Sequence, residues 1–496
     1  MKKKIVALLF LFLMAPVFAT GCASKNEKEI KKASKNIDEY NISMTFDDYK
    51  LSAKQSTTYI NKSDDVMTEV YLHLYPQSFR RDAKNSPVGK MYTKKAYPNG
   101  ESYCDFTISS ILVNGVEHGV YYTGSDDDIL QITLDADLYP NEKIDLKFEY
   151  NMTIPNVLHR FGYGDNTINI ANFYPIMCVY ENGWIKDGYN SNGDPFYSNL
   201  ANYNIELTTN NKYKVATTGE ILSKTSTYEN DTYKIKARAV RDYACVLSEK
   251  FETVSEKVGD TTITYYYYDD VTPRESLKAG VDAIKTFSEK FGAYPYSTFS
   301  IVKTNFIHGG MEYPTLVYIS DAVTDVGDYK NVIIHETAHQ WWYGLVGSNA
   351  FRCGWLDEGL TDFSTALFYK YNPDYNIKFE DVMKNTTNSF VTFVDLYTRV
   401  LGDIDTSMLR AVDDYKTEPE YVYISYVKGA LLFNDLYELL GEEKFLKVMK
   451  EYLKTYKFKN VNYENLIGIV EIVTKTDMDS YFDSWLQGKV VIKSIE

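Results

Sequence analysis

The chain has 496 residues, which is too long for one ordinary hydrophobic core and predicts two or three domains. Apolar residues make up 44% and charged residues 24%, a composition typical of folded globular proteins. The formal net charge of −15 argues against a nucleic-acid partner, because such a partner requires a basic surface.

The first residues have the features of a bacterial export signal. Three lysines, Lys2 to Lys4, precede an apolar run from Ile5 to Phe18 that is short for a membrane span. The "ATGC" that follows ends in Gly21-Cys22 and resembles a lipobox, in which the cysteine is lipidated and becomes the first mature residue. We therefore expect residues 1–21 to be a lipoprotein signal peptide and Cys22 to carry the lipid. An ordinary cleaved signal with a chance cysteine is the alternative.

Residues 22–39 are highly charged and contain few apolar residues, which is typical of a tether. A lipid at Cys22 and this tether would hold the protein outside the cytoplasm, on the cell membrane. The four later cysteines show no metal-binding spacing, and both disulfides and buried thiols remain open for them: Cys104, Cys178, Cys245 and Cys353.

Residues 40–269 read as short strands separated by turns. "EVYLHLYP" and "KIDLKFEYNM" alternate apolar and polar residues, and "ILVNGVEHGVYY" places an Asn-Gly turn between two apolar runs. This pattern predicts an N-terminal β-sandwich-like domain.

The spacing of the apolar residues changes from alternation to a helical period at about residue 270. "TPRESLKAGVDAIKTFSEKFG" begins with Thr-Pro, has apolar residues at helical spacing and ends in glycine. Helices dominate from there to residue 488, apart from strands in "TFSIVKTNF" and "TLVYIS". We therefore expect an α+β multidomain fold, with a mostly helical domain at 270–488 and a short tail at 489–496.

"NVIIHETAHQWW" in this second domain places His335 and His339 four residues apart. On a helix their rings would project from one face and could share a metal ion, while Glu336 could act on water as a general base. The alternative is a solvated helix face or a pair of structural histidines.

A catalytic zinc ion usually has three protein ligands and an open position. Glu358 in "GWLDEG" follows His339 after eighteen residues and is the candidate third ligand. Asp362 lies one helical turn further on and could accept the second N–H of a ligating histidine. An exposed helix charge is an equally good interpretation of Asp362.

These motifs resemble the gluzincin pattern of the M1 aminopeptidases. The match includes H-E-x-x-H with the later glutamate, and "HGGMEYP" upstream resembles the family's G-x-M-E-N segment. "YVKGALLF", from Tyr426, resembles the downstream Y-x-K-G segment, and "YFDSWLQG" resembles the end of the catalytic domain. The resemblance implies a β-sandwich domain followed by a thermolysin-like domain with one Zn²⁺ per chain.

The resemblance also implies roles for single residues. Glu336 would take a proton from the attacking water, and Tyr426 would donate a hydrogen bond to the developing oxyanion. Glu312 would bind the free α-ammonium group of a peptide substrate. The backbone of Gly309, Gly310 and Met311 would lie along that substrate.

Three departures from the family bear on specificity. Tyr313 stands where the family has asparagine. The second amine-binding residue from the β-domain has no clear counterpart, although Asn172 and Glu181 are candidates by position. No helical C-terminal domain follows residue 488, so we expect a more open cleft or one covered by another chain.

We expect a zinc metallopeptidase that removes N-terminal residues from peptides outside the cytoplasmic membrane. One alternative is an endopeptidase or another hydrolase of the same fold. Another is a lipid-anchored binding or assembly component with little activity. The sequence leaves the side-chain preference and the oligomeric state open.

Overall fold

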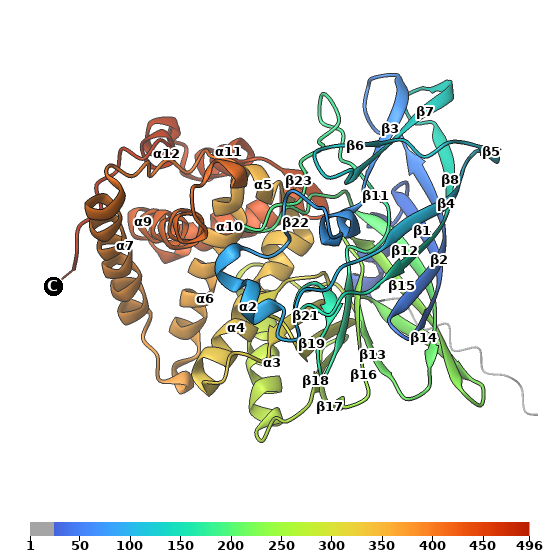
Figure 1. The fold of residues 1–496 in the computed structure, drawn as a ribbon. Helices are drawn as coiled ribbons and strands as arrows, with labels where there is room; N and C mark the ends of the chain where they lie inside the picture. The colour runs from blue at the N-terminus through green and yellow to red at the C-terminus, as the bar shows by residue number, and fades with distance from the viewer. Residues whose placement is uncertain (1–23, 496) are drawn as a thin grey trace, which may run out of the picture.

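The computed structural model describes residues 24–495, which form a β-rich half followed by a mostly helical half (Figure 1). This order confirms the α+β fold class expected from the sequence. The signal-peptide and Cys22 predictions fall on residues outside the described part. Within residues 24–495, no helix is long and apolar enough to cross a bilayer.

The first half contains the following elements. They are α1 (Lys25–Ala33), β1 (Asp38–Asp47), β2 (Lys50–Ile60), β3 (Met67–His73), η1 (Tyr75–Phe79), η2 (Lys90–Tyr92), α2 (Thr93–Ala96), β4 (Phe106–Val113), β5 (Val116–Glu117), β6 (Tyr122–Thr123), β7 (Ile129–Leu138), β8 (Lys143–Thr153), β9 (Phe161–Tyr163), β10 (Ile168–Ala171), β11 (Ile176–Met177), β12 (Ala201–Asn210), β13 (Lys214–Thr217), β14 (Glu220–Ser226), β15 (Asn230–Val240) and β16 (Ala244–Ser248).

The second half contains the remaining elements. They are β17 (Glu252–Val258), β18 (Thr261–Tyr267), α3 (Pro273–Lys290), β19 (Thr298–Thr304), β20 (Gly310–Met311), β21 (Leu316–Ser320), α4 (Val326–His339), η3 (Gln340–Leu345), β22 (Val346–Ser348), α5 (Ala350–Gly354), η4 (Trp355–Gly359), α6 (Leu360–Tyr371), η5 (Pro373–Tyr375), α7 (Phe379–Leu401), η6 (Val412–Asp414), α8 (Glu418–Val422), η7 (Tyr423–Lys428), α9 (Gly429–Leu440), α10 (Glu442–Tyr456), β23 (Lys459–Val461), α11 (Tyr463–Thr474) and α12 (Asp479–Leu486).

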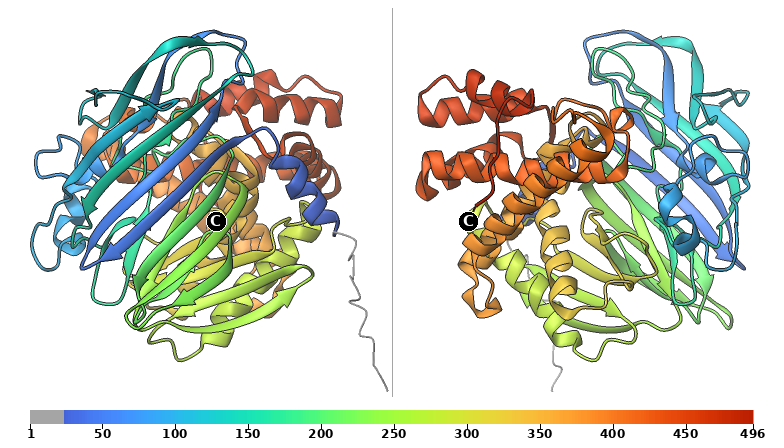
Figure 2. Two further views of the ribbon diagram at one scale, coloured as in Figure 1. Left: turned by 90° about the vertical axis from the view of Figure 1, so that its right-hand side faces the viewer. Right: turned by 60° about the vertical axis from the view of Figure 1, so that its left-hand side comes forward.

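A large sheet forms the outer wall of the β-rich half. Its eight strands lie in the order β14-β15-β12-β1-β2-β8-β4-β5, and Figure 2 shows one face of it. Side chains along β1 alternate between the core and the solvent, as expected for a strand with one buried face. Two four-stranded sheets, β13-β16-β10-β9 and β11-β3-β7-β6, complete this half. The Met177 amide of β11 donates a 3.1 Å hydrogen bond to the Tyr40 hydroxyl of β1, which ties one small sheet to the large one.

The boundary between the halves lies earlier than the expected residue 270. β17 and β18 belong to a five-stranded sheet of order β17-β18-β19-β21-β20, in which β18 runs parallel to β19. Residues 252–267 are therefore part of the second half. The alternating pattern identified these residues as strands, but alternation does not tell which sheet a strand joins.

Residues 22–39 were expected to form a charged tether, but the structure shows helix α1 over half of this segment, at Lys25–Ala33. The Ser24 hydroxyl caps the helix by accepting a hydrogen bond from the Glu27 amide, and Ile30 is buried. Net charge and low apolar content describe the exposed side of this helix and do not reveal its single buried residue.

Arg241, between β15 and β16, joins the two halves. Its guanidinium donates hydrogen bonds to the backbone oxygens of Tyr343 and Lys459, at 2.7 and 2.6 Å. Gly347 gives it room, because a Cβ there would lie 2.1 Å from the guanidinium carbon. The β-rich half is thus fixed directly behind the C-terminal end of α4.

The C-terminal tail is irregular and is attached to α7. Residues 489–495 have no regular structure, and Asn388 of α7 makes two hydrogen bonds to the backbone of Ile495.

The four cysteines within residues 24–495 are buried and free, so this structure favours thiols over disulfides.

Candidate functional site

The two histidines of the H-E-x-x-H stretch lie at the end of α4. Asp325 caps this helix by accepting two amide hydrogen bonds from its first turn. One helical turn separates His335 from His339, which places them on one face with their Nε2 atoms 3.1 Å apart.

Glu358 approaches the same pair from η4, a wide turn that precedes α6. Its Oε2 lies 3.1 Å from His339 Nε2 and 3.5 Å from His335 Nε2. The oxygen is buried, and no described residue donates a hydrogen bond to it. Two ring nitrogens and one carboxylate oxygen therefore converge on one point, which suits a bound cation.

The other nitrogen of each histidine faces a second carboxylate. His335 Nδ1 lies 2.9 Å from Asp362 Oδ1, and His339 Nδ1 lies 2.8 Å from Asp357 Oδ1. A proton on each Nδ1 satisfies these contacts and leaves both Nε2 lone pairs facing the shared centre. Burial lowers the pKa of His335, but the Asp362 and Glu358 carboxylates outweigh it and raise that pKa to about 10. A cation that binds at Nε2 would therefore displace a proton from His335.

Glu336 lies beside the histidines with 5% of its surface exposed. Burial raises the pKa of this carboxyl group to about 7, which suits a general base near neutral pH. Gly310 lies directly against it, because a Cβ at residue 310 would lie 2.3 Å from Glu336 Oε1. The short strand β20 can approach the base only because Gly310 has no side chain.

The strand β20 forms the edge of the five-stranded sheet, next to β21. Its outer side can therefore pair with an extended peptide. Glu312 follows β20 and is 3% exposed, yet no residue within 24–495 donates a hydrogen bond to its side chain. Burial raises the pKa of Glu312 well above its ordinary value, and the neighbouring Asp194 carboxylate adds to the rise.

Tyr426 reaches the centre from η7. Its hydroxyl donates a 2.6 Å hydrogen bond to Glu358 Oε1, and its ring lies parallel to that of His335 with the centroids 6.3 Å apart. Two glycines make this approach possible, because a Cβ on Gly359 would lie 2.5 Å from the Cα of Gly429. The glycines of "WLDEG" and "YVKG" thus bring η4 and η7 into backbone contact.

Comparison with known proteins identifies this arrangement. Residues 275–485 match the family model described as the peptidase family M1 domain. Residues 275–485 form a peptidase family M1 domain. The family resemblance drawn from the sequence motifs is therefore confirmed.

Curated relatives match the M1 domain only in part. Aminopeptidase M1-D of Oryza sativa subsp. japonica is 27% identical over 237 residues, which is 44% of this chain and 26% of that protein. Aminopeptidase N of Streptomyces lividans is 27% identical over 217 residues, 40% of this chain and 24% of the relative. The chain thus spans about a quarter of the length of these relatives.

Solved structures match the fold over almost the whole chain. An M1 zinc metallopeptidase from Deinococcus radiodurans has a TM-score of 0.66 and 17% identity, covering 93% of this chain and 96% of that one. A variant of a Deinococcus radiodurans M1 zinc metallopeptidase bound to a Tyr-Ser-Ala substrate has a TM-score of 0.65 and 16% identity, with the same coverage. At this identity the likeness shows a shared two-domain fold.

The metal centre of the M1 domain opens into a pocket of about 300 Å³. Sequence reasoning missed two carboxylates in its lining, those of Glu418 in α8 and of Asp194. Asp194 comes from the long connection between β11 and β12. Carboxylate oxygens of Asp194, Glu312 and Glu358 all lie within 4.8 Å of one another. Asp194 also forms an ion pair with buried Arg160. The sequence "SNGDPF" carries no signal of this role, because only the fold brings the connection to the pocket.

The two candidates for a second amine-binding residue do not line this pocket. Asn172 accepts a 2.9 Å hydrogen bond from the Tyr313 hydroxyl and donates one of 2.6 Å to Asp242. Glu181 accepts a hydrogen bond from the Tyr197 hydroxyl and borders a different hollow. The unusual Tyr313 is fully buried and binds the β-rich half, so it lies behind the pocket wall.

Lys428 of "YVKG" links two distant segments of the M1 domain. It is fully buried and donates hydrogen bonds to the backbone oxygens of Thr406 and Trp485, at 2.6 and 3.1 Å. Trp485 belongs to "YFDSWLQG", so this lysine ties the end of the domain to the turn that carries Tyr426.

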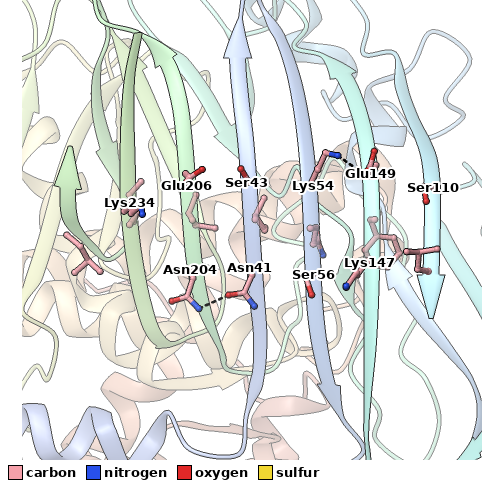
Figure 3. Close-up of a pocket in the computed structure, with 17 residues that line it drawn as sticks. Asn41, Ser43, Lys54, Ser56, Ser110, Lys147, Glu149, Asn204, Glu206 and Lys234 are labelled. Atoms are coloured by element: carbon pink, nitrogen blue, oxygen red, sulfur yellow. Dashed lines mark hydrogen bonds and ion pairs between the residues drawn. The ribbon is translucent and has the colours of Figure 1, made fainter. Parts of the chain in front are cut away.

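A larger hollow, of about 560 Å³, lies on the exposed face of the eight-stranded sheet (Figure 3). Polar side chains pair across its strands, such as Lys54 with Glu149 at 2.8 Å and Asn204 with Asn41 at 2.9 Å. The residues that line it include no histidine or cysteine. Size alone therefore does not mark the functional site of this M1 protein.

Proposed function

We propose that this chain is a zinc-dependent peptidase that removes residues from the N-termini of peptides. The proposal rests on the convergence of His335 Nε2, His339 Nε2 and Glu358 Oε2 beside the buried Glu312 carboxylate. Two imidazole nitrogens and one carboxylate oxygen are ligands that a catalytic zinc ion takes, and one ion per chain fits this centre. The aminopeptidase names of the relatives and the zinc metallopeptidase fold support the proposal.

Zinc bound at this centre would act as a Lewis acid toward the scissile carbonyl and would lower the pKa of water. The residues of the chain perform the remaining steps. Glu336 accepts a proton from the attacking water and delivers it to the leaving amine. The Tyr426 hydroxyl, which donates to Glu358 in this structure, can donate to the substrate oxygen as negative charge develops on it.

The surroundings of Glu312 favour a free N-terminus over a peptide interior. A peptide that pairs with β20 places its first residue next to Glu312 and Asp194. Two buried carboxylates at this point attract an ammonium group and penalise a neutral amide. Arg160 neutralises part of the charge of Asp194, which weakens the repulsion between Asp194 and Glu312.

Replacement of the base tests the hydrolytic assignment. Glu336→Gln should abolish peptide cleavage while the protein still binds one zinc ion, because Glu336 is not among the converging ligands. Metal content by elemental analysis and activity on aminoacyl fluorogenic substrates are the two measurements. Substantial activity in a fully zinc-loaded Glu336→Gln protein would contradict the mechanism.

Blocked substrates separate this function from its alternatives. N-acetylation of a good peptide substrate should stop cleavage, because it removes the ammonium group that Glu312 and Asp194 bind. Equal cleavage of blocked and free peptides would favour an endopeptidase of the same fold. Absence of cleavage of any peptide by zinc-loaded protein would favour a binding or assembly role.

We further propose that the protein is exported and held on the outer side of the cytoplasmic membrane by a lipid at Cys22. The lysines at residues 2–4, the apolar run and the Gly21-Cys22 pair support this location. Mass spectrometry of the N-terminus after membrane extraction is the test. A water-soluble mature protein that begins at another residue would refute the lipid anchor.

A further inference from the structure

Helix α1 has one face on the protein and one face in solvent. Its inner residues are spaced three and four apart and are buried or half-buried: Asn26, Glu29, Ile30 and Ala33. Its lysines are all exposed: Lys25, Lys28, Lys31 and Lys32. Lys25, Lys28 and Lys32 follow the same helical spacing and form one stripe along the outer side.

The inner face is attached to both halves of the molecule. Asn26 donates a 3.2 Å hydrogen bond to the Tyr294 oxygen, and Lys457 forms a 2.9 Å ion pair with Glu29. At the other end, Asn202 of β12 donates a 2.9 Å hydrogen bond to the Ser34 oxygen. The orientation of α1 therefore fixes the orientation of the whole protein.

The lysine stripe has no partner within residues 24–495. None of its side chains forms an ion pair or a hydrogen bond there, and Glu27 is the exposed acid on the helix. Glu220 and Asp260 border the hollow beneath the start of the helix. An unpaired basic stripe is unusual on a chain with a net charge of −15, and it suits a negatively charged surface.

We propose that this lysine stripe lies on a membrane surface that contains anionic lipids. The inference rests on the proposed membrane attachment, because only two residues separate Cys22 from the start of α1 at Lys25. The three steps from Cys22 to Lys25 span at most about 10–11 Å, which is close to the roughly 10 Å over which charges interact at about 0.1 M salt. Attachment at Cys22 therefore brings the stripe within range of the head groups.

The stripe also sets where the active site faces. Tyr92, beside α2, packs its ring against His308 at the pocket. In Figure 2, left, α1 lies at one side of the molecule and α2 at the opposite side. A membrane on the lysine stripe would leave the α2 side, and the pocket it borders, turned toward the solution.

Vesicle binding by a chain that begins at Ser24 tests the stripe without the anchor. The described residues contain a continuous core, so this chain retains the fold. We expect it to sediment with vesicles that contain phosphatidylglycerol and not with vesicles of phosphatidylcholine alone. The combined Lys25→Gln, Lys28→Gln and Lys32→Gln variant should lower the partition coefficient roughly fivefold per lysine, with kcat/KM for peptides unchanged.

A matched variant controls for net charge. Lys84→Gln, Lys90→Gln and Lys94→Gln remove three exposed lysines near α2, and binding should persist. Three results would each overturn the proposal. They are an equal loss of vesicle binding in both variants, no binding of the unaltered chain to anionic vesicles, and binding to soluble polyphosphate but not to vesicles. These outcomes are independent of peptide cleavage and of lipid at Cys22, so the failure of one proposal can be told from the failure of another.

Discussion

Replacement of Asp194 by asparagine tests how the pocket recognises a substrate N-terminus. Carboxylate oxygens of Asp194, Glu312 and Glu358 lie within 4.8 Å of one another, so one ammonium group can contact more than one of them. A hydrogen bond to a charged group contributes about 1.5–3 kcal/mol, and about 1.4 kcal/mol corresponds to a tenfold change. Asp194→Asn should therefore lower kcat/KM for free-amine substrates by about 10- to 100-fold.

The ion pair with Arg160 requires a second variant. Asp194→Asn leaves a buried guanidinium without its counter-charge, which is expected to destabilise the fold by about 3–5 kcal/mol. A double variant that adds Arg160→Met removes this unpaired charge. If Asp194 contacts substrate, the double variant regains thermal stability while kcat/KM stays low.

Aminoacyl fluorogenic substrates and a thermal melt provide both measurements. A kcat/KM within about threefold of wild type in a stably folded Asp194→Asn protein would refute an ammonium contact. Full recovery of activity in the double variant would show that Asp194 serves only to neutralise Arg160.

Three further predictions follow from other contacts. Tyr426→Phe should lower kcat by about 10²–10³-fold with little change in KM, the loss expected for one oxyanion donor, and an unchanged kcat would contradict that role. Gly310→Ala should impair kcat because its Cβ would lie 2.3 Å from Glu336 Oε1, whereas Gly309→Ala, whose Cβ meets only Val332 at 3.7 Å, should remain active. Equal activities in these two variants would show that β20 does not position the base. Burial lowers the pKa of His73 to about 4, below its ordinary 6.5, so the unfolded state binds this proton more readily. The free energy of unfolding therefore falls by about 3 kcal/mol through this group between pH 6.5 and pH 4 and is unaffected by it above pH 6.5. Urea unfolding of His73→Phe should show a smaller decrease over this pH range than the wild type. An equal decrease in the two proteins would contradict the burial of a neutral His73.

The local parts of the site could be predicted from the sequence because their geometry is helical. His335 and His339 share a face through their spacing alone, and Glu336 follows from its place beside them. Glu358 was a candidate because a catalytic zinc ion needs a third ligand, whereas the role of Tyr426 required the family resemblance. The folding of separate segments brings both residues to the histidines. The structure places all five around one point.

Contacts between distant segments account for what the sequence did not reveal. Asp194 lies in an irregular connection, and only the packing of the two halves carries it to Glu312. Asp362, the candidate from the sequence, contacts His335, whereas Asp357, which the sequence analysis did not single out, makes the same contact with His339. Tyr313 departs from the family, yet its hydroxyl binds Asn172 behind the pocket and not in it.

The attachment of the two halves through Arg241 has a consequence for how specificity can evolve. The ligands, the base and the tyrosine all come from the second half, whereas Asp194 and Arg160 come from the first. Under the proposed function, a second half joined to another β-rich half would keep the groups that break an amide bond and lose part of the site that selects a substrate N-terminus. Because Arg241 fixes the contact between the halves, recombination or mutation at this contact would then change substrate selection without altering a metal ligand.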